Sequence, residues 1–266
     1  MSVYLNVRAF LRLVLFLFLI SSYVLFGLFL YLIIRNPFKR RGILIRNGSR
    51  FSRLLMKTFG VRVSCINPIP KNEVSLLVGN HIGFIDILCL QALQPSVFIT
   101  SLEMKNTPGL GQICEVAGCA YVNRKSRMNI KDELQNIVDV LKEGFRVVLY
   151  AESIASNGEQ VLPFKKTLMM SAGYAEVPIR PFVFNFVKIN QQKVDIKYRD
   201  SVCWYGDQSF LSSIWRSLKL DSVECEIEFL PLVNIRFDDD RTEVAQKIHL
   251  MVSSKFRPFI PIIKNM

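Results

Sequence analysis

The sequence has few residues of the kinds that bind structural metals. It contains only two histidines, and none of its six cysteines stands in a C-x-x-C pair. Zinc sites and dithiol redox centres are built from such spacings, so we predict no metal and no bound organic cofactor. Single cysteines inside apolar runs, such as Cys89 and Cys119, are typical of buried thiols in a reducing compartment.

Acidic residues are scarce relative to basic ones. The chain has 34 Lys and Arg against 22 Asp and Glu, a formal net charge of +12 at pH 7. A basic protein can bind nucleic acid, but no zinc spacing, recognition-helix pattern or aromatic RNA-binding motif accompanies this charge. Many basic residues instead adjoin the hydrophobic N-terminal segment, where anionic lipid headgroups would lie. We therefore predict a membrane lipid surface as the partner, and no nucleic acid.

The N-terminal segment lacks charge from Leu13 to Ile34, a run of 22 residues. As a helix it would measure about 33 Å, enough to cross a bilayer core or to lie along its interface. It is too long for a typical signal peptide, and no small-residue cleavage site follows it. Basic residues are denser after the run, which predicts that the main domain is cytoplasmic. We interpret residues 1–45 as a membrane anchor with a basic linker.

Residues 46–266 show apolar runs that alternate with amphipathic segments. Strands are predicted at residues 61–65, 75–78, 97–100, 119–123, 146–150, 178–187, 194–198 and 224–229. Helices are predicted at residues 51–59, 85–93, 129–142, 166–175 and 240–256. Strands alternating with helices favour an α/β fold: a single domain whose mostly central mixed sheet is flanked by helices, preceded by the hydrophobic membrane helix.

One segment, Gly79-Asn80-His81-Ile82-Gly83-Phe84-Ile85-Asp86, places a histidine five residues before an aspartate. It reads as the turn between a buried strand and a helix, where a side chain can face a substrate. Five residues of ideal helix rotate about 500°, so the two side chains can meet only if His81 precedes the helix. An imidazole oriented by a carboxylate can take a proton from a hydroxyl, which indicates acyl transfer to an alcohol. A purely structural histidine is the alternative.

Further blocks follow in order along about 100 residues. The four blocks are Asn80-His81-x-x-x-x-Asp86; Gly118-Cys119-Ala120-Tyr121-Val122-Asn123-Arg124; Glu152-Ser153-Ile154 with Asn157-Gly158 and Val161-Leu162-Pro163-Phe164-Lys165; and Val177-Pro178-Ile179-Arg180-Pro181. Together they resemble the signature of the glycerolipid acyltransferases, typified by 1-acylglycerol-3-phosphate acyltransferase. One such block is a weak signal, whereas four in the family's order are specific.

The resemblance implies a membrane-associated enzyme that transfers a fatty acyl chain from acyl-CoA or acyl carrier protein to the hydroxyl of a lysolipid. The default acceptor is 1-acylglycerol-3-phosphate, which would give phosphatidate. His81 is then the general base and Asp86 orients it. Asn80, Arg124, Glu152 and Ser153 are expected to bind substrate. The Arg124 guanidinium suits an anionic head group, unless it only ends a strand in solvent.

The third block departs from the family pattern. Its usual Phe-Pro-Glu-Gly-Thr is replaced by Tyr150-Ala151-Glu152-Ser153-Ile154. A glycine would permit unusual backbone dihedrals, and a threonine would offer a hydroxyl. The change favours an altered acceptor site, and it leaves open a degenerate relative that binds lipid without turnover.

The segment Trp204-Tyr205-Gly206-Asp207 resembles one found in a bacterial branch of these enzymes. That branch also includes lyso-ornithine lipid acyltransferases, so lyso-ornithine lipid is the alternative acceptor. An aromatic loop that packs on the domain would explain the segment equally well. A bacterial source implies the cell inner membrane, with the catalytic domain on the cytoplasmic side. We interpret His249, in the last predicted helix, as a surface or interface residue.

Overall fold

The computed structural model describes residues 2–123 and 130–259. In these residues one sheet of eight strands has the order β1-β8-β6-β2-β5-β3-β4, with β7 paired to β6. The strands are β1 Val61–Ile66, β2 Leu76–Gly79, β3 Val97–Ser101, β4 Ala120–Val122, β5 Val147–Tyr150, β6 Ile179–Ile189, β7 Gln192–Lys193 and β8 Val223–Phe229. Paired strands are parallel except that β6 runs antiparallel to β7 and β8. The predicted mixed sheet is confirmed.

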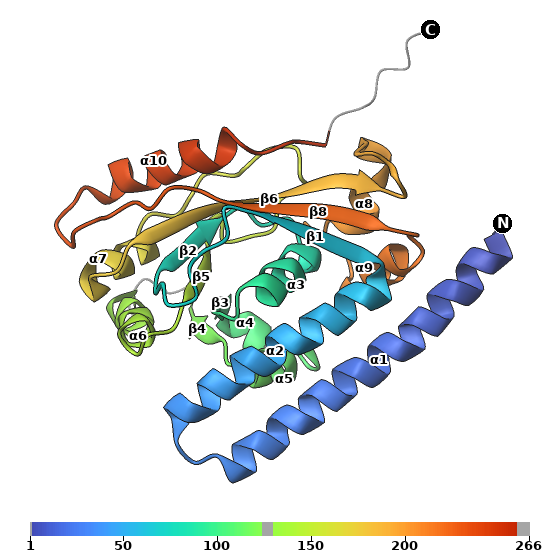
Figure 1. The fold of residues 1–266 in the computed structure, drawn as a ribbon, viewed down its shortest axis with the longest axis horizontal. Helices are drawn as coiled ribbons and strands as arrows, with labels where there is room; N and C mark the ends of the chain where they lie inside the picture. The colour runs from blue at the N-terminus through green and yellow to red at the C-terminus, as the bar shows by residue number, and fades with distance from the viewer. Residues whose placement is uncertain (1, 124–129, 260–266) are drawn as a thin grey trace, which may run out of the picture.

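The helices cover both faces of this sheet (Figure 1). They are α1 Ser2–Ile33, α2 Pro37–Phe59, α3 Phe84–Leu93, α4 Leu102–Lys105, α5 Leu110–Val116, α6 Ile130–Lys142, α7 Ser171–Ala175, α8 Arg199–Val202, α9 Phe210–Leu218 and α10 Arg241–Ser253, with the 3₁₀ turns η1 Leu168–Met170 and η2 Ile196–Tyr198. The predicted α/β class with flanking helices is therefore confirmed.

Alternate residues of the central strands enter two separate cores. Leu76 and Val147 pack with α6, α7 and α10 on one face of the sheet. Their neighbours Leu77 and Val148 pack with α2, α3 and α9 on the other face. Successive side chains of a strand point to opposite faces, so strands covered by helices on both sides become apolar throughout. This explains why β2 and β5 are buried at every position.

The position of β2 beside β5 determines where a site can form. These strands are parallel, and their last residues, Gly79 and Tyr150, are partners in the register. The loops that follow them, residues 80–83 and residues 151–165, therefore leave the sheet at the same edge. We call them the His81 loop and the Glu152 loop. In open α/β sheets, sites form beyond the carboxyl ends of the strands.

The two N-terminal helices lie side by side as an antiparallel hairpin (Figure 1). Asn36 caps α2 by accepting a hydrogen bond from the Lys39 N–H, and Pro37 fits the first turn because it needs no donor there. The basic linker is thus helical, and the boundary that we predicted between residues 45 and 46 lies inside α2.

Polar side chains join α1 to the domain near both of its ends. Arg8 forms an ion pair with Asp221, and the Arg12 guanidinium donates to the carbonyl of Leu220 at 2.5 Å. At the other end, the Tyr31 hydroxyl donates to the Glu115 carbonyl at 3.1 Å. Between them α1 approaches α5 closely: a Cβ on Gly27 would lie 2.4 Å from the Cβ of Val116. The helix therefore lies along the domain over most of its length.

Three predicted elements differ from the structure. The helix predicted at residues 51–59 begins earlier, at Pro37, as α2. The strand predicted at residues 194–198 is wrong, because a 3₁₀ turn occupies Ile196–Tyr198. The Asp195 side chain accepts a hydrogen bond from the Lys197 N–H and so caps this turn, a local bond that competes with strand pairing. The helix predicted at residues 166–175 forms only from Leu168, as η1 followed by α7.

Candidate active site

His81 and Asp86 meet at the carboxyl end of β2. The His81 ring Nδ1 lies 3.1 Å from each carboxylate oxygen of Asp86. A carboxylate can only accept, so Nδ1 carries the proton and Nε2 is left with a lone pair. The Asp86 side chain is 1% exposed and the His81 side chain 18% exposed. The pair therefore has a buried orienting group and a partly accessible base, as general-base chemistry requires.

Asp86 also orders the backbone that carries His81. Its Oδ2 accepts hydrogen bonds from the N–H groups of Ile82 at 2.6 Å and Gly83 at 2.8 Å. Asp86 lies in the first turn of α3, where a carboxylate is favoured by the helix dipole and by the unpaired N–H groups. His81 lies before the helix, which is the arrangement that the five-residue spacing demanded.

Two other segments bind the His81 loop through its backbone. The His81 N–H donates to Glu152 Oε1 at 2.8 Å, and its carbonyl accepts from the Ser156 N–H at 2.8 Å. The Ile82 carbonyl accepts from the Trp204 N–H at 3.0 Å. The position of the base is therefore set by distant parts of the chain. Glu152 and Ser156 lie more than 70 positions from His81, and Trp204 lies more than 120 positions away.

Glu152 is buried, and both of its carboxylate oxygens accept hydrogen bonds from the backbone. Oε1 binds the His81 N–H, and Oε2 binds the Leu162 N–H at 2.9 Å. Burial raises the pKa of Glu152 to about 7, although the two N–H donors act to lower it. Glu152 therefore joins the His81 loop to the Glu152 loop, and its expected contact with substrate stays a prediction.

Asn80 joins two strands. Its amide donates to the Phe184 carbonyl at 3.0 Å and accepts from the Phe184 N–H at 2.8 Å. The side chain is 1% exposed, so its polar atoms face β6. This bidentate contact links β2 to β6 where the His81 loop begins, and the expected contact of Asn80 with substrate stays a prediction.

The backbone of Ser153 explains why the family has a glycine at this point in its pattern. Ser153 has φ of 67°, in the left-handed region that favours glycine. The next residue, Ile154, is 64% exposed and presents a branched apolar side chain at the surface. Ser153 therefore keeps the unusual backbone conformation of the family's glycine, while Ile154 changes the exposed surface of the loop.

Arg124, the predicted head-group ligand, lies outside the described residues. The strand before it, β4, ends at Val122, and it runs parallel to β3.

Residues 60–185 match the Acyltransferase family profile, and this range contains His81, Asp86 and Glu152. By this match, the part of the chain that holds the candidate site is an acyltransferase domain. Its activity is that of a glycerolipid or lysolipid acyltransferase.

Relatives of this acyltransferase include enzymes named for different acceptor lipids. It is 27% identical over 225 residues to a lyso-ornithine lipid O-acyltransferase of Brucella abortus, covering 82% of each chain. It is 28% identical over 182 residues to a 1-acyl-sn-glycerol-3-phosphate acyltransferase of Neisseria gonorrhoeae, covering 68% of this chain and 69% of the relative. Both are bacterial.

The fold of the acyltransferase also matches a solved structure. The crystal structure of the 1-acyl-sn-glycerophosphate acyltransferase PlsC from Thermotoga maritima superposes with a TM-score of 0.66 and 19% sequence identity. The match covers 94% of this chain and 95% of that one, so it includes the N-terminal helices as well as the sheet.

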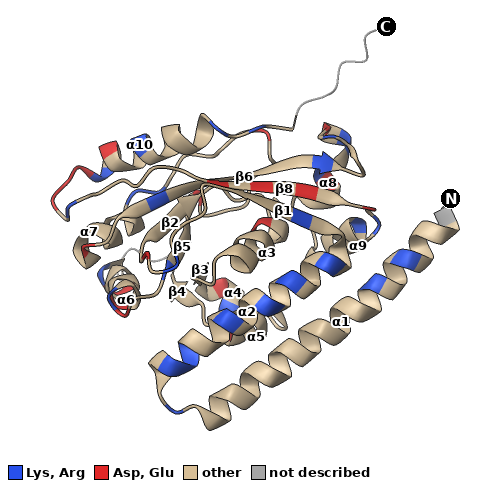
Figure 2. Cartoon of the chain, viewed as in Figure 1, with Lys and Arg blue, Asp and Glu red and all other residues tan. Residues whose placement is uncertain are grey.

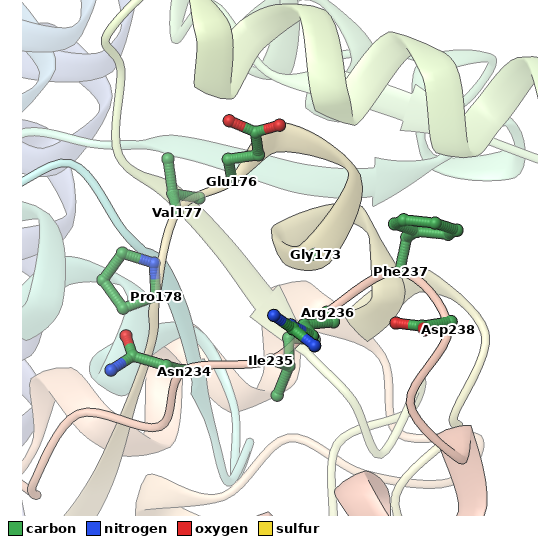
Figure 3. Close-up of a pocket in the computed structure, with 9 residues that line it drawn as sticks. All are labelled: Gly173, Glu176, Val177, Pro178, Asn234, Ile235, Arg236, Phe237 and Asp238. Carbon is green, nitrogen blue, oxygen red and sulfur yellow. The ribbon is translucent and has the colours of Figure 1, made fainter.

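A cavity of about 490 Å³ lies elsewhere on the acyltransferase (Figure 3). Its lining residues are Gly173, Glu176, Val177, Pro178, Asn234, Ile235, Arg236, Phe237 and Asp238. The first four precede β6, so the cavity lies where that strand begins. Because β2 is parallel to β6, the His81 loop leaves β2 at the opposite end. The cavity has no part in the chemistry of His81.

Sequence reasoning missed several residues that support the site. The Tyr150 ring stacks on His81, with centroids 4.2 Å apart and planes 17° apart. Its only signal in the sequence was a tyrosine where the family pattern has phenylalanine. Ser156 and Trp204 act through backbone N–H groups, which carry no sequence signal. His249 joins α10 to the Glu152 loop, because its Nε2 lies 3.2 Å from the Val161 carbonyl.

Proposed function

We propose that the protein transfers a fatty acyl chain from an acyl thioester to the free hydroxyl of a lysolipid, with His81 as the general base. The observation that carries the proposal is the contact of His81 Nδ1 with both oxygens of buried Asp86. This contact fixes the tautomer in which Nε2 can accept a proton. The imidazolium that forms is stabilised by the same carboxylate.

The chemistry needs no nucleophile from the protein. His81 Nε2 takes the proton of the lysolipid hydroxyl as that oxygen attacks the thioester carbonyl carbon. A tetrahedral intermediate forms, and its C–S bond then breaks. The proton on Nε2 passes to the departing thiolate, which leaves as a thiol, and His81 returns to its neutral form. The donor would be acyl-CoA or acyl carrier protein, and no metal or organic cofactor takes part.

The acceptor that we propose first is 1-acylglycerol-3-phosphate, giving phosphatidate. The name of the Neisseria relative and the Arg124 block support it. Lyso-ornithine lipid is the second candidate, because the Brucella relative of that name aligns over a larger share of this chain. The two lipids differ in the anionic group near the reacting hydroxyl, a phosphate in one and a carboxylate in the other. A guanidinium can bind either group.

We further propose that α1 lies in the plane of the membrane. It is long and apolar enough to cross one. However, it is bonded to the domain at Arg12 and again at Tyr31, about 28 Å further along the helix. A helix crossing the bilayer would carry the adjoining domain surface through the hydrocarbon, where its polar groups would lose their water.

The side of the hairpin that the domain leaves uncovered suits a lipid interface. Many apolar side chains of α1 are exposed: Phe10, Leu11, Val14, Leu15, Leu17, Phe18, Leu25, Phe26, Leu28, Phe29, Leu32 and Ile33. Lys and Arg residues occur along α2, whereas the second half of α1 has none (Figure 2). Apolar side chains would enter the acyl region, and the cations would meet anionic headgroups. We place this surface on the inner membrane, with the catalytic domain in the cytoplasm.

Protease protection of an N-terminal tag tests the orientation of α1. In sealed inside-out vesicles, an in-plane helix leaves the tag on the same side as the domain, where protease removes it. A tag that is protected until the vesicles are opened would show that the helix crosses. A tag after residue 266 is the matched control, because it stays with the domain in either case.

Acyl transfer by the purified full chain in mixed micelles tests the activity. Labelled acyl-CoA and acyl carrier protein are each offered with lysophosphatidate and with lyso-ornithine lipid. We expect turnover that falls by at least about 10³-fold in His81→Ala and persists in His249→Ala, the matched control at the other histidine. The preferred acceptor decides between the two lipids. Folded protein that binds lysolipid but turns over no donor–acceptor pair would refute catalysis and support a lipid-binding relative.

A further inference from the structure

Tyr150 lies in contact with the reacting pair and has no role in the mechanism above. It is the last residue of β5, and its ring faces the core on the α3 side of the sheet. The ring stacks almost parallel on His81, with centroids 4.2 Å apart. The residue is 7% exposed. A phenylalanine, which the family pattern has here, would provide the same stacking surface.

The hydroxyl is what distinguishes Tyr150 from that phenylalanine. It is buried, and among the described residues it has no hydrogen bond of normal geometry. A buried hydroxyl without a partner costs about 1–3 kcal/mol, so its presence calls for a physical reason. Burial, and then the Asp86 carboxylate, raise the pKa of the Tyr150 phenol well above its ordinary value. The phenol therefore stays neutral near pH 7, and a neutral hydroxyl can donate to a carboxylate.

Asp86 has an oxygen that can accept from this donor. Its Oδ2 is bonded to the N–H groups of Ile82 and Gly83 as well as to His81. Within the described chain, the bond recorded for Oδ1 is the one with His81, at 3.1 Å. A carboxylate oxygen can accept two bonds, so Oδ1 has room for a hydroxyl.

We propose that Tyr150 is a positioning residue for the acyl-transfer pair: its ring holds the plane of the His81 imidazole, and its hydroxyl acts on Asp86 to weaken the pair as a base. This inference rests on the proposed function. A donor near Oδ1 draws negative charge away from His81, so the imidazolium is less stabilised. A base of lower strength returns its proton more readily to the departing thiolate, which is the second step of the reaction.

Other titratable groups interact with His81, Asp86 or Tyr150, so their effects on the base must be distinguished from that of Tyr150. These groups are Glu152, Cys89, Cys203 and Cys225. Burial raises the pKa of the Cys203 and Cys225 thiols, so these stay neutral near pH 7. Glu152 has its pKa raised to about 7 by burial and titrates in the working range, so it needs a control of its own.

Tyr150→Phe removes the hydroxyl and keeps the ring. We expect the acid limb of the kcat/KM profile to move to higher pH by roughly half a unit, with kcat at its maximum within about threefold of wild type. The same shift is expected in a Glu152→Gln background, which removes the other titrating neighbour. Superimposable profiles in both backgrounds would overturn the action of the hydroxyl.

Tyr150→Leu removes the stacking surface as well. We expect kcat to fall by at least about tenfold while KM changes by less than about threefold, since the base loses its orientation and the acceptor contacts remain. A Tyr150→Leu protein that keeps the kcat of Tyr150→Phe would overturn the role of the ring. If Tyr150→Leu does not fold, Tyr150→Met replaces it as an unstacked side chain of similar size.

A readout without turnover separates this inference from the proposed function. The chain has two histidines, so His249→Gln leaves His81 as the only imidazole in a ¹H–¹⁵N spectrum. Adding Tyr150→Phe should move the midpoint of its titration to higher pH by the same half unit or so. Absent turnover in wild type would refute the proposed function alone, whereas an unmoved midpoint would refute the role of Tyr150.

Discussion

The His81 loop and the Glu152 loop leave neighbouring parallel strands at one edge of the sheet, but they differ in how the sequence constrains them. In the His81 loop, the N–H and carbonyl groups of His81 and Ile82 and the N–H of Gly83 are hydrogen-bonded to distant segments or to Asp86. In the Glu152 loop, Ser153 occupies a left-handed conformation and Ile154 extends to the surface. The first loop matches the family pattern, and the second departs from it.

The two loops have different roles: one carries the side chain that reacts, and the other holds that side chain in position. The His81 loop presents an imidazole, so the identity of the residue matters. The Glu152 loop supplies the Glu152 carboxylate and the Ser156 N–H, and a backbone group survives replacement of its side chain. Sequence departures at Ser153 and Ile154 are therefore compatible with an intact reacting pair.

The largest expected effect comes from breaking the His81 loop at its orienting group. In Asp86→Asn the amide carbonyl can still accept from the Ile82 and Gly83 N–H groups, which turns the amide NH₂ toward His81 Nδ1. Nδ1 must then accept, so the proton moves to Nε2 and the base is lost. We expect kcat/KM to fall about 10²–10⁴-fold, measured at saturating donor, with the protein still folded by circular dichroism. Activity within threefold of wild type would contradict the assigned tautomer.

Breaking the contact between the loops should have a smaller effect. Glu152→Gln keeps one acceptor but turns a donor toward either the His81 or the Leu162 N–H. The lost bond is of a kind worth about 1–3 kcal/mol, so kcat should fall about 10–100-fold while the lysolipid KM changes little. A rise in KM with kcat unchanged would instead show that Glu152 contacts the acceptor.

The same variant makes a prediction about stability and pH. The folded pKa of Glu152, about 7, lies above the ordinary 4.5, so the folded protein binds this proton more tightly than the unfolded chain. This contribution to the unfolding free energy is complete below the ordinary pKa and is lost as pH rises through about 7. Urea unfolding of wild type should therefore show a fall over this range that Glu152→Gln lacks. Parallel curves would contradict the raised pKa.

The smallest effect is expected from restoring the family residue at the strained position. Ser153→Gly relieves the left-handed conformation but adds freedom to the unfolded chain, for a net stabilisation of about 0.5–1 kcal/mol. Chemical denaturation measures it, and kcat should stay within about twofold. Ile154→Thr is the matched control: its exposed side chain should change stability by less than about 0.5 kcal/mol. A loss of stability in Ser153→Gly would show that the serine side chain outweighs the strain.

The sequence predicted much of the fold because the central strands β2, β5 and β6 are buried on both faces. Apolar runs such as Leu76–Gly79 and Val147–Tyr150 have no other stable place than the interior of a sheet covered by helices. The prediction failed at residues 194–198, where the side chain of Asp195 caps a 3₁₀ turn. A local side-chain bond of this kind depends on the conformation of one residue and leaves hydrophobic periodicity unchanged.

The site was predicted in part. His81 and Asp86 are close in the sequence, so their pairing follows from a turn before a helix. Asn80 and Glu152 are predicted to bind substrate, which stays a prediction. The structure adds contacts that the sequence did not predict: Asn80 bonds to Phe184, and Glu152 bonds to the backbone of His81 and Leu162. These contacts depend on burial and strand order, and neither is visible in a single sequence.

The sequence by itself determined the alternation of strands and helices, the apolar N-terminal helix and the spacing of His81 and Asp86, because each depends on neighbours within a few turns of chain. Tertiary structure decided which strands adjoin. By placing β5 beside β2, it brought Tyr150 onto the His81 ring and Glu152 onto its backbone. It also laid α1 along the domain through Arg8, Arg12 and Tyr31. Contacts between residues so far apart in the sequence depend on packing of the whole chain, and so they appear only in the folded molecule.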